Sequence, residues 1–148
     1  MVGKMRLVRE DTLYMLNLIE DALKGGSLES ILKYDTKAKG RVRKALDMLG
    51  SSTIVHLVCN GRSSWFYVGP HSVHYIIPKT YCSCIDFNIN VIFRGRIPTC
   101  YHLVVHVINT ALGRVKTLNV KINDYEKILE EVIKEEDSRR LRVLLVKA

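Results

Sequence analysis

Two close pairs of metal-binding residue types constrain this chain more than any other sequence feature. Cys82 and Cys84 form the first pair, fifteen residues follow, and Cys100 and His102 form the second pair. A tetrahedral zinc ion takes four thiolate or imidazole ligands, and close pairs supply them with little loss of chain entropy within each pair. The paired spacing is far rarer by chance than isolated cysteines. The sequence therefore predicts one structural zinc ion held by these four residues.

The spacing inside each pair indicates the backbone that carries it. In an extended strand or turn, residues two apart point to the same side, so the first pair can reach one ion. Cys100 and His102 would point about 200° apart inside a regular helix. We therefore expect them at the open N-terminal end of a helix, with Thr99 as its candidate N-cap. The helix dipole there would favour a thiolate.

The remaining histidines and cysteine leave alternatives open. His106 lies one helical turn after His102, so it could replace His102 as the fourth ligand. Alternatively, it could contact His102 and hold it in place without binding the metal. We expect packing or surface roles for the unpaired residues of the predicted strands, which are Cys59, His56, His71 and His74. The alternative for the four ligands themselves is a set of core cysteines beside a hydrogen-bonded histidine.

Apolar periodicity predicts a helical N-terminal part over about residues 1–50. Residues 11–23 have helical spacing, with Asp11 as a candidate N-cap and Gly25-Gly26 as the stop. A second helical segment is expected to open at residues 27–30, and a third covers residues 42–49.

The pattern then changes to the alternation of a β-sheet. Strands over 53–59 and 65–68 flank Asn60-Gly61, a strong hairpin turn signal, and 73–77 follows as a third strand. This antiparallel meander leads into the first cysteine pair. The spacer over 85–98 suits a short helix followed by a loop at 94–96, and 100–112 has the broad apolar face of a buried helix.

The C-terminal part, about 114–148, is expected to hold one helix and a tail. Asn123 or Asp124 is a candidate cap for the helix. The apolar tail over 141–146 fits a terminal strand, a helix continuation or a partner-binding segment, and the pattern does not choose among them. The predicted fold class is α+β: a small antiparallel β-meander with flanking helices and a zinc-stabilised finger over about 51–113. A length of 148 residues suits a single domain spanning 1–148.

A net charge of +8 favours a polyanionic partner, because Lys and Arg release counterions when they bind phosphates. The candidate nucleic-acid-binding residues near the finger are Arg94, Arg96, Arg114 and Lys116. A second basic cluster on the helical side contains Lys37, Lys39, Arg41, Arg43 and Lys44. Trp65, Phe66 and Tyr67 could stack on bases, although alternation in a strand buries at least one of them. The alternative for each charge cluster is a solvated face, which is the usual role of a run of charges.

The chain shows no apolar run of the length that a membrane span needs, and its start lacks the apolar run of a signal peptide. Closely spaced cysteines also suit a reducing compartment better than a disulfide scaffold. We therefore expect an intracellular protein, cytoplasmic in a prokaryote or nuclear in a eukaryote, with no membrane partner.

The ligand order, Cys-x-Cys followed by Cys-x-His, resembles the SWIM zinc finger. Because the finger lies in a chain of one domain, the protein resembles the small stand-alone SWIM subunits of recombination-accessory complexes of the Shu type. The segments that follow this family's order cover about residues 43–112 and are Lys44–Leu49, Thr53–Val68, Tyr81–Cys84 and Cys100–Leu103. The chain departs from the family at Val104, where alanine is frequent.

The resemblance implies an interaction subunit that partners a RecA-family recombinase paralogue in a heteromer. Such a subunit supports recombinase filaments on single-stranded DNA during homologous-recombination DNA repair. The chain contains no Gly-x4-Gly-Lys-Ser/Thr phosphate loop, so ATP chemistry would belong to the partner. Four ligands would also close the zinc shell, so we expect neither an enzyme nor a small-molecule substrate. The alternative is a zinc module that binds single-stranded DNA or RNA directly, without a recombinase partner.

Overall fold

A five-stranded mixed sheet lies between two groups of helices in the computed structural model, which describes residues 10–148. The strand order is β4-β3-β2-β1-β5. The strands are β1 Thr53–Cys59, β2 Arg62–Val68, β3 Val73–Ile77, β4 Tyr81–Cys82 and β5 Val115–Asn119. The predicted α+β class with a β-meander is confirmed.

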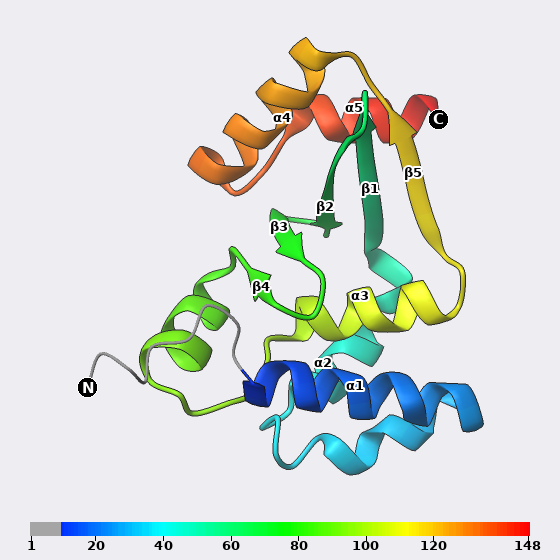
Figure 1. Cartoon of the computed structure of the whole chain (residues 1–148), viewed down its shortest axis with the longest axis vertical. Helices are drawn as coiled ribbons and strands as arrows, with labels where there is room; N and C mark the ends of the chain where they lie inside the picture. Colours follow the sequence, from blue (N-terminus) through cyan, green and yellow to red (C-terminus); the bar gives the residue numbers. More distant parts are fainter. Residues whose placement is uncertain (1–9) are drawn as a thin grey trace.

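Helices surround this sheet. The α-helices are α1 Glu10–Gly25, α2 Arg41–Met48, α3 Tyr101–Ala111, α4 Ile122–Glu135 and α5 Arg139–Lys147. Two short 3₁₀ segments, η2 Leu28–Tyr34 and η3 Leu49–Ser51, and a π-helix, η4 Phe87–Phe93, complete the set. Figure 1 shows α1, α2 and α3 at one end of the molecule and α4 and α5 at the other.

Strand alternation divides the interior into two cores. Ile54, Tyr67 and Ile76 belong to a cluster with α1, α2, α3 and the three cysteines of the predicted metal site. Their neighbours Val55 and Phe66 belong to a separate cluster with α4 and α5. Because successive side chains of a strand point to opposite faces, one sheet supports both helical layers. The predicted metal ligands therefore lie on the α1–α3 side of the sheet.

The β1–β2 hairpin forms at the predicted turn. Asn60 and Gly61 have φ angles of 46° and 82°. A two-residue hairpin turn of type I′ requires a positive φ at both of these positions. The sheet also contains an element that the sequence does not predict. β5 pairs with β1 in parallel, with Ile54 opposite Val115. This edge strand is largely exposed and its partner is distant in sequence, so the alternation signal is weak.

The helix ends correct two predictions. Asp11 lies within the first turn of α1 rather than before it. Lys121 is the N-cap of α4 and makes no side-chain cap, so neither Asn123 nor Asp124 has this role. The undecided C-terminal tail is helical, and Ser138 caps α5 by accepting a hydrogen bond from Leu141 N at 3.1 Å. The part of the helical prediction that covers residues 1–9 lies outside the described residues.

Within residues 10–148, no helix combines the length and the apolar character that a bilayer span requires.

Candidate metal centre

The four predicted ligands come together at one buried point. One ligand atom from each of Cys82, Cys84, Cys100 and His102 lies within 4.8 Å of all the others, and all four residues are buried. Four donors at about 2.3 Å from a tetrahedral ion are about 3.8 Å apart. If the distances between the ligand atoms shortened by about 1 Å or less, all four atoms could bond to one ion. These residues are therefore positioned to bind one metal ion.

The first pair lies where β4 runs out of the sheet. Cys82 is opposite Ile76 of β3, and Ser83 extends the pairing by donating its N–H to Tyr75 O at 3.0 Å. The Asn88 amide donates to the carbonyls of Cys82 and Cys84, at 3.3 and 2.8 Å. These bonds fix the backbone on both sides of the pair, so the two sulfur atoms face the same point.

Cys84 also receives a backbone hydrogen bond from the π-helix that follows it. Phe87 N–H donates to Cys84 Sγ at 3.3 Å, and the Phe87 side chain is buried. An N–H aimed at sulfur favours the ionised form, which is the form that binds a metal. The first residue of η4 therefore stabilises the thiolate form of Cys84.

The second pair opens α3, as predicted, but the cap residue differs. Cys100 is itself the N-cap, with an extended backbone at φ −89° and ψ 170°, and His102 lies in the first turn. Thr99 instead donates its hydroxyl to Cys100 O at 3.0 Å, so its prediction as N-cap is wrong. Thr12 Oγ1 donates to Pro98 O at 2.6 Å and holds this entry segment against α1. Because Cys100 is outside the helix, the 200° separation of a regular helix does not apply.

The three thiols respond differently to their shared burial. Burial raises the pKa of Cys82 and Cys100, because a thiolate loses hydration there. Hydrogen bonds from the thiols of Cys100 and Cys82 lower the pKa of Cys84. The helix N-terminus alone therefore does not keep Cys100 ionised. Three sulfur atoms this close can all be thiolates only around a cation, and zinc fits this donor set.

Aromatic rings fix the imidazole of His102. The ring centroids of Tyr67, His74 and Tyr101 lie 4.4, 4.5 and 4.0 Å from its own. Its Nδ1 atom is buried and has no hydrogen-bond partner among the described residues. One of the two ring nitrogens of His102 lies within 4.8 Å of the three sulfur atoms, so the histidine also fits a ligand role.

His74 is a neighbour of the centre that sequence reasoning assigned to packing or the surface. It is buried, and its Nε2 lies 3.0 Å from Ser72 Oγ. Burial and the neighbouring His102 lower the pKa of His74 to about 4, so the ring is neutral at pH 7. The alternation of strand residues could have indicated this position. It places His74 on the same face of the sheet as Ile76, which pairs with Cys82.

His106 does not join the ligand cluster. Its ring centroid lies 4.8 Å from Trp65 in an edge-on contact, and both of its ring nitrogens are buried without hydrogen-bond partners in the described chain. The alternative fourth ligand is therefore not part of the group that the structure assembles. Cys59 is buried in the opposite core, with Val55 and Phe66, as its predicted packing role requires.

An ion pair joins the centre to α2. Arg41 donates from Nε and Nη2 to the two carboxylate oxygens of Asp86, at 3.1 and 2.7 Å. Burial opposes ionisation of Asp86, but the hydrogen bonds from Arg41 and Asn90 hold its pKa below the usual value. The sequence analysis placed Arg41 in a basic cluster, but in the structure its guanidinium pairs with Asp86.

The candidate nucleic-acid-binding residues fall into two places. Arg94 and Arg96 are exposed in the loop between η4 and α3. Arg114 and Lys116 are exposed beyond the other end of α3, whose eleven residues span roughly 16 Å. The four residues therefore lie beyond opposite ends of α3. The aromatic run of β2 is mainly internal, since Phe66 and Tyr67 are buried and Trp65 is half-buried against His56.

Comparison with protein-family models, curated proteins and solved structures gives no match to this chain. The likeness to the SWIM finger therefore rests on the order and spacing of the ligands and their neighbours. At the point of departure from that family, Val104 is fully buried in the core beside α1 and α2 and displaces no ligand.

Proposed function

We propose that the protein binds one structural zinc ion through Cys82, Cys84, Cys100 and His102. The observation that carries this proposal is the convergence of four buried donor atoms within 4.8 Å. Three thiolates and one imidazole are a set found in structural zinc sites, where they close a tetrahedral shell. A closed shell leaves no coordination position for a water nucleophile, so the role of the metal is to hold the fold rather than to catalyse a reaction.

The centre joins parts of the chain that are distant in sequence. Its ligands come from the end of β4, the turn before η4 and the start of α3, and Arg41 extends the connection to α2. Structural zinc contributes about 10–16 kcal/mol of apparent binding free energy that is also folding free energy. Zinc binding therefore fixes the position of the π-helix against the sheet and the N-terminal helices.

The same π-helix offers a surface for a protein partner. It buries Phe87 and Val91, while Ile85 and Phe93 are 75% and 82% exposed and Ile89 and Ile92 are partly exposed beside them. Neighbouring exposed apolar side chains of this size often mark a protein contact. We call Ile85, Ile89, Ile92 and Phe93 the finger face.

We infer from the SWIM resemblance that this partner is a RecA-family recombinase paralogue. In this proposal the finger face contacts the ATPase, and the heteromer supports recombinase filaments on single-stranded DNA during homologous recombination. The chain itself performs no ATP chemistry. What supports the assignment is the Cys-x-Cys and Cys-x-His order together with the hairpin that leads into it; the exposed finger face supports a protein contact in general.

Affinity purification of the chain from its native cells, followed by mass spectrometry, tests the partner. The proposal expects a RecA-fold ATPase to co-purify in stoichiometric amount. Recovery of the zinc-loaded chain without such an ATPase would contradict the recombinase assignment. That result would favour the second candidate, a zinc module that binds a nucleic acid single strand on its own, which the basic residues beside the finger favour.

A further inference from the structure

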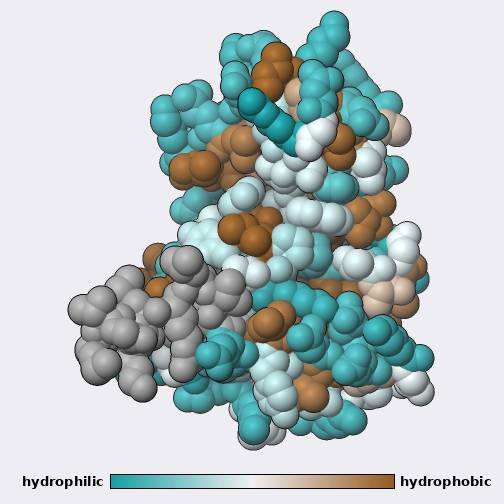
Figure 2. All heavy atoms as spheres, viewed as in Figure 1, coloured by the Kyte–Doolittle hydropathy of each residue, from teal (hydrophilic) through white to brown (hydrophobic). Residues whose placement is uncertain are grey.

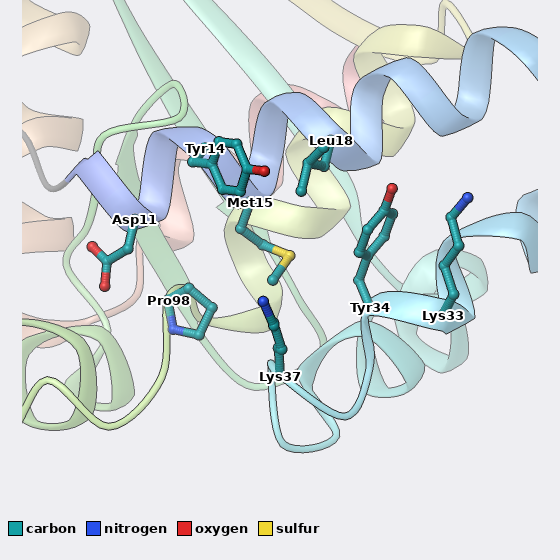
Figure 3. A pocket seen from close by; sticks show the side chains of 8 residues that line it. All are labelled: Asp11, Tyr14, Met15, Leu18, Lys33, Tyr34, Lys37 and Pro98. Carbon is teal, nitrogen blue, oxygen red and sulfur yellow. The ribbon is translucent and has the colours of Figure 1, made fainter.

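A hollow between α1 and the segment that follows it belongs to no part of the metal centre. Its volume is about 600 Å³. The described residues that line it are Asp11, Tyr14, Met15, Leu18, Lys33, Tyr34, Lys37 and Pro98. Figure 3 shows Met15 and Leu18 extending down from α1, the Tyr14 ring lying in front of this helix, and Lys37 reaching up from the turn after η2. The hollow thus has an apolar and aromatic floor with ammonium groups at its rim.

A second hollow of about 260 Å³ lies next to it and is basic. Lys39, Arg41, Asn90, Arg96 and Ile97 line it. The same two segments of the chain contribute to both hollows, because Lys37 and Lys39 belong to one turn and Ile97 and Pro98 are consecutive residues. We call the two together the α1 groove.

The rim of the α1 groove has an excess of positive charge. Lys33, Lys37, Lys39 and Arg96 are exposed cations along it. Arg41 is balanced by Asp86, and Asp11 places a carboxylate at one end. Over α1 and η2, in the lower part of the view, Figure 2 shows hydrophobic residues surrounded by hydrophilic ones. A ligand of this groove therefore needs flat apolar groups together with negative charges.

Two tyrosines provide the flat surfaces. Tyr14 is 66% exposed at the edge of the groove. The Lys33 ammonium lies over the ring of Tyr34, 5.4 Å from its centroid, so a cation and an aromatic ring are held together at this position. Proteins bind single-stranded nucleic acid with this combination: bases stack on aromatic rings, and nearby cations follow the phosphates.

We propose that the α1 groove binds single-stranded DNA, with a base against Tyr14 and Tyr34 and the adjoining phosphates near Lys37, Lys39 and Arg96. The choice of DNA rests on the proposed function in recombination. Of the four candidate residues near the finger, only Arg96 lines the described groove, and Arg114 and Lys116 are beyond the far end of α3. Lys37 and Lys39 of the second basic cluster also line the groove.

The test is fluorescence anisotropy of a labelled oligothymidylate with the zinc-loaded full chain at several salt concentrations. Tyr14→Ala should weaken binding roughly 5- to 150-fold, the range seen when a stacking ring is removed. Lys37→Ala with Lys39→Ala should reduce the slope of log affinity against log salt by about 1.4, because two phosphate contacts are lost. The matched control is Lys121→Ala with Lys127→Ala, which removes the same charge at α4, and it should leave the slope close to that of the wild type.

Several results would overturn the proposal. The proposal fails if the wild-type chain does not bind the oligothymidylate at low salt. It also fails if the groove variants and the α4 variant lose the same amount of affinity. Tighter binding of RNA of the same sequence would remove the assignment to DNA. Binding of an acidic aromatic peptide at Tyr14, without binding of the oligonucleotide, would assign the groove to a protein.

Zinc content and ATPase co-purification of each variant separate this proposal from the proposed function. If DNA binding is absent while zinc and the ATPase are retained, the groove proposal alone fails. If Tyr14→Ala and the wild type differ as expected but no ATPase is recovered, the recombinase assignment alone fails.

Discussion

Arg41 and Asp86 form a two-point ion pair that joins α2 to the turn after the first cysteine pair. The two oxygens of Asp86 accept from the Arg41 guanidinium at 3.1 and 2.7 Å, and both side chains are only about one quarter exposed, at 26% and 27%. Asn90 donates to the same carboxylate at 2.8 Å. The pair therefore fixes the metal-bearing turn on the helical side of the molecule.

Replacing Asp86 should destabilise the zinc-loaded protein. Asp86→Ala leaves the half-buried Arg41 without its partner, so we expect a loss of about 1–2 kcal/mol in the free energy of unfolding. Asp47→Ala removes the same charge from an exposed position in α2 and should cost less than about 0.5 kcal/mol. Urea denaturation of both variants in excess zinc measures the difference. Equal stabilities would show that the pair does not hold the turn.

Burial of His106 predicts a pH dependence of stability. Its pKa is lowered to about 4 by burial and then by Lys79 and His56, whereas an unfolded histidine has a pKa of 6.5. Because the unfolded chain takes up the proton more readily, stability is complete above pH 6.5 and falls as the pH decreases toward 4. The loss attributable to this residue is about 2 kcal/mol at pH 5.

Denaturation of the wild type and of His106→Leu at pH 7 and pH 5 isolates this contribution. The variant has no imidazole at this position, so its stability relative to the wild type should rise by about 2 kcal/mol on going to pH 5. Loss of metal at low pH affects both proteins and cancels in the comparison. An unchanged difference between the two pH values would contradict the prediction.

Substitutions in the finger face should remove partner binding without affecting folding. Phe93→Ser combined with Ile85→Ser should abolish co-purification of the ATPase while zinc content and melting temperature remain close to the wild type, because both side chains are largely exposed. Val146→Ser is the matched control, since this valine is 86% exposed at the end of α5. Retention of the partner by the double variant would place the contact elsewhere.

The sequence was informative where the determinants are local. The ligand spacing and the Asn60-Gly61 turn each depend on a few neighbouring residues, and the structure contains the cluster and the hairpin that they predict. The start of α3 was also predictable to within one residue. The choice between Thr99 and Cys100 as N-cap was not, because it depends on the extended backbone of Cys100, which the residue types alone do not specify.

Features that join distant segments could not be predicted. Arg41 and Asp86 are 45 residues apart, so the charge pattern alone assigned Arg41 to a basic surface. β5 pairs with β1 across the whole meander and α3, and its exposed edge position removes most of the hydrophobic alternation. The proximity of His74 to His102 likewise depends on the registration of β3 with β4, which no local pattern encodes.

The metal content of the purified chain tests the central claim most directly. Inductively coupled plasma mass spectrometry of protein purified without added metal should give one zinc ion per chain. Cys84→Ser and His102→Ala should lose the ion, whereas Cys59→Ser, which changes the cysteine of the opposite core, should retain it. Wild-type protein that is folded and contains no zinc, or a Cys84→Ser variant that keeps the full amount, would contradict the four-ligand centre.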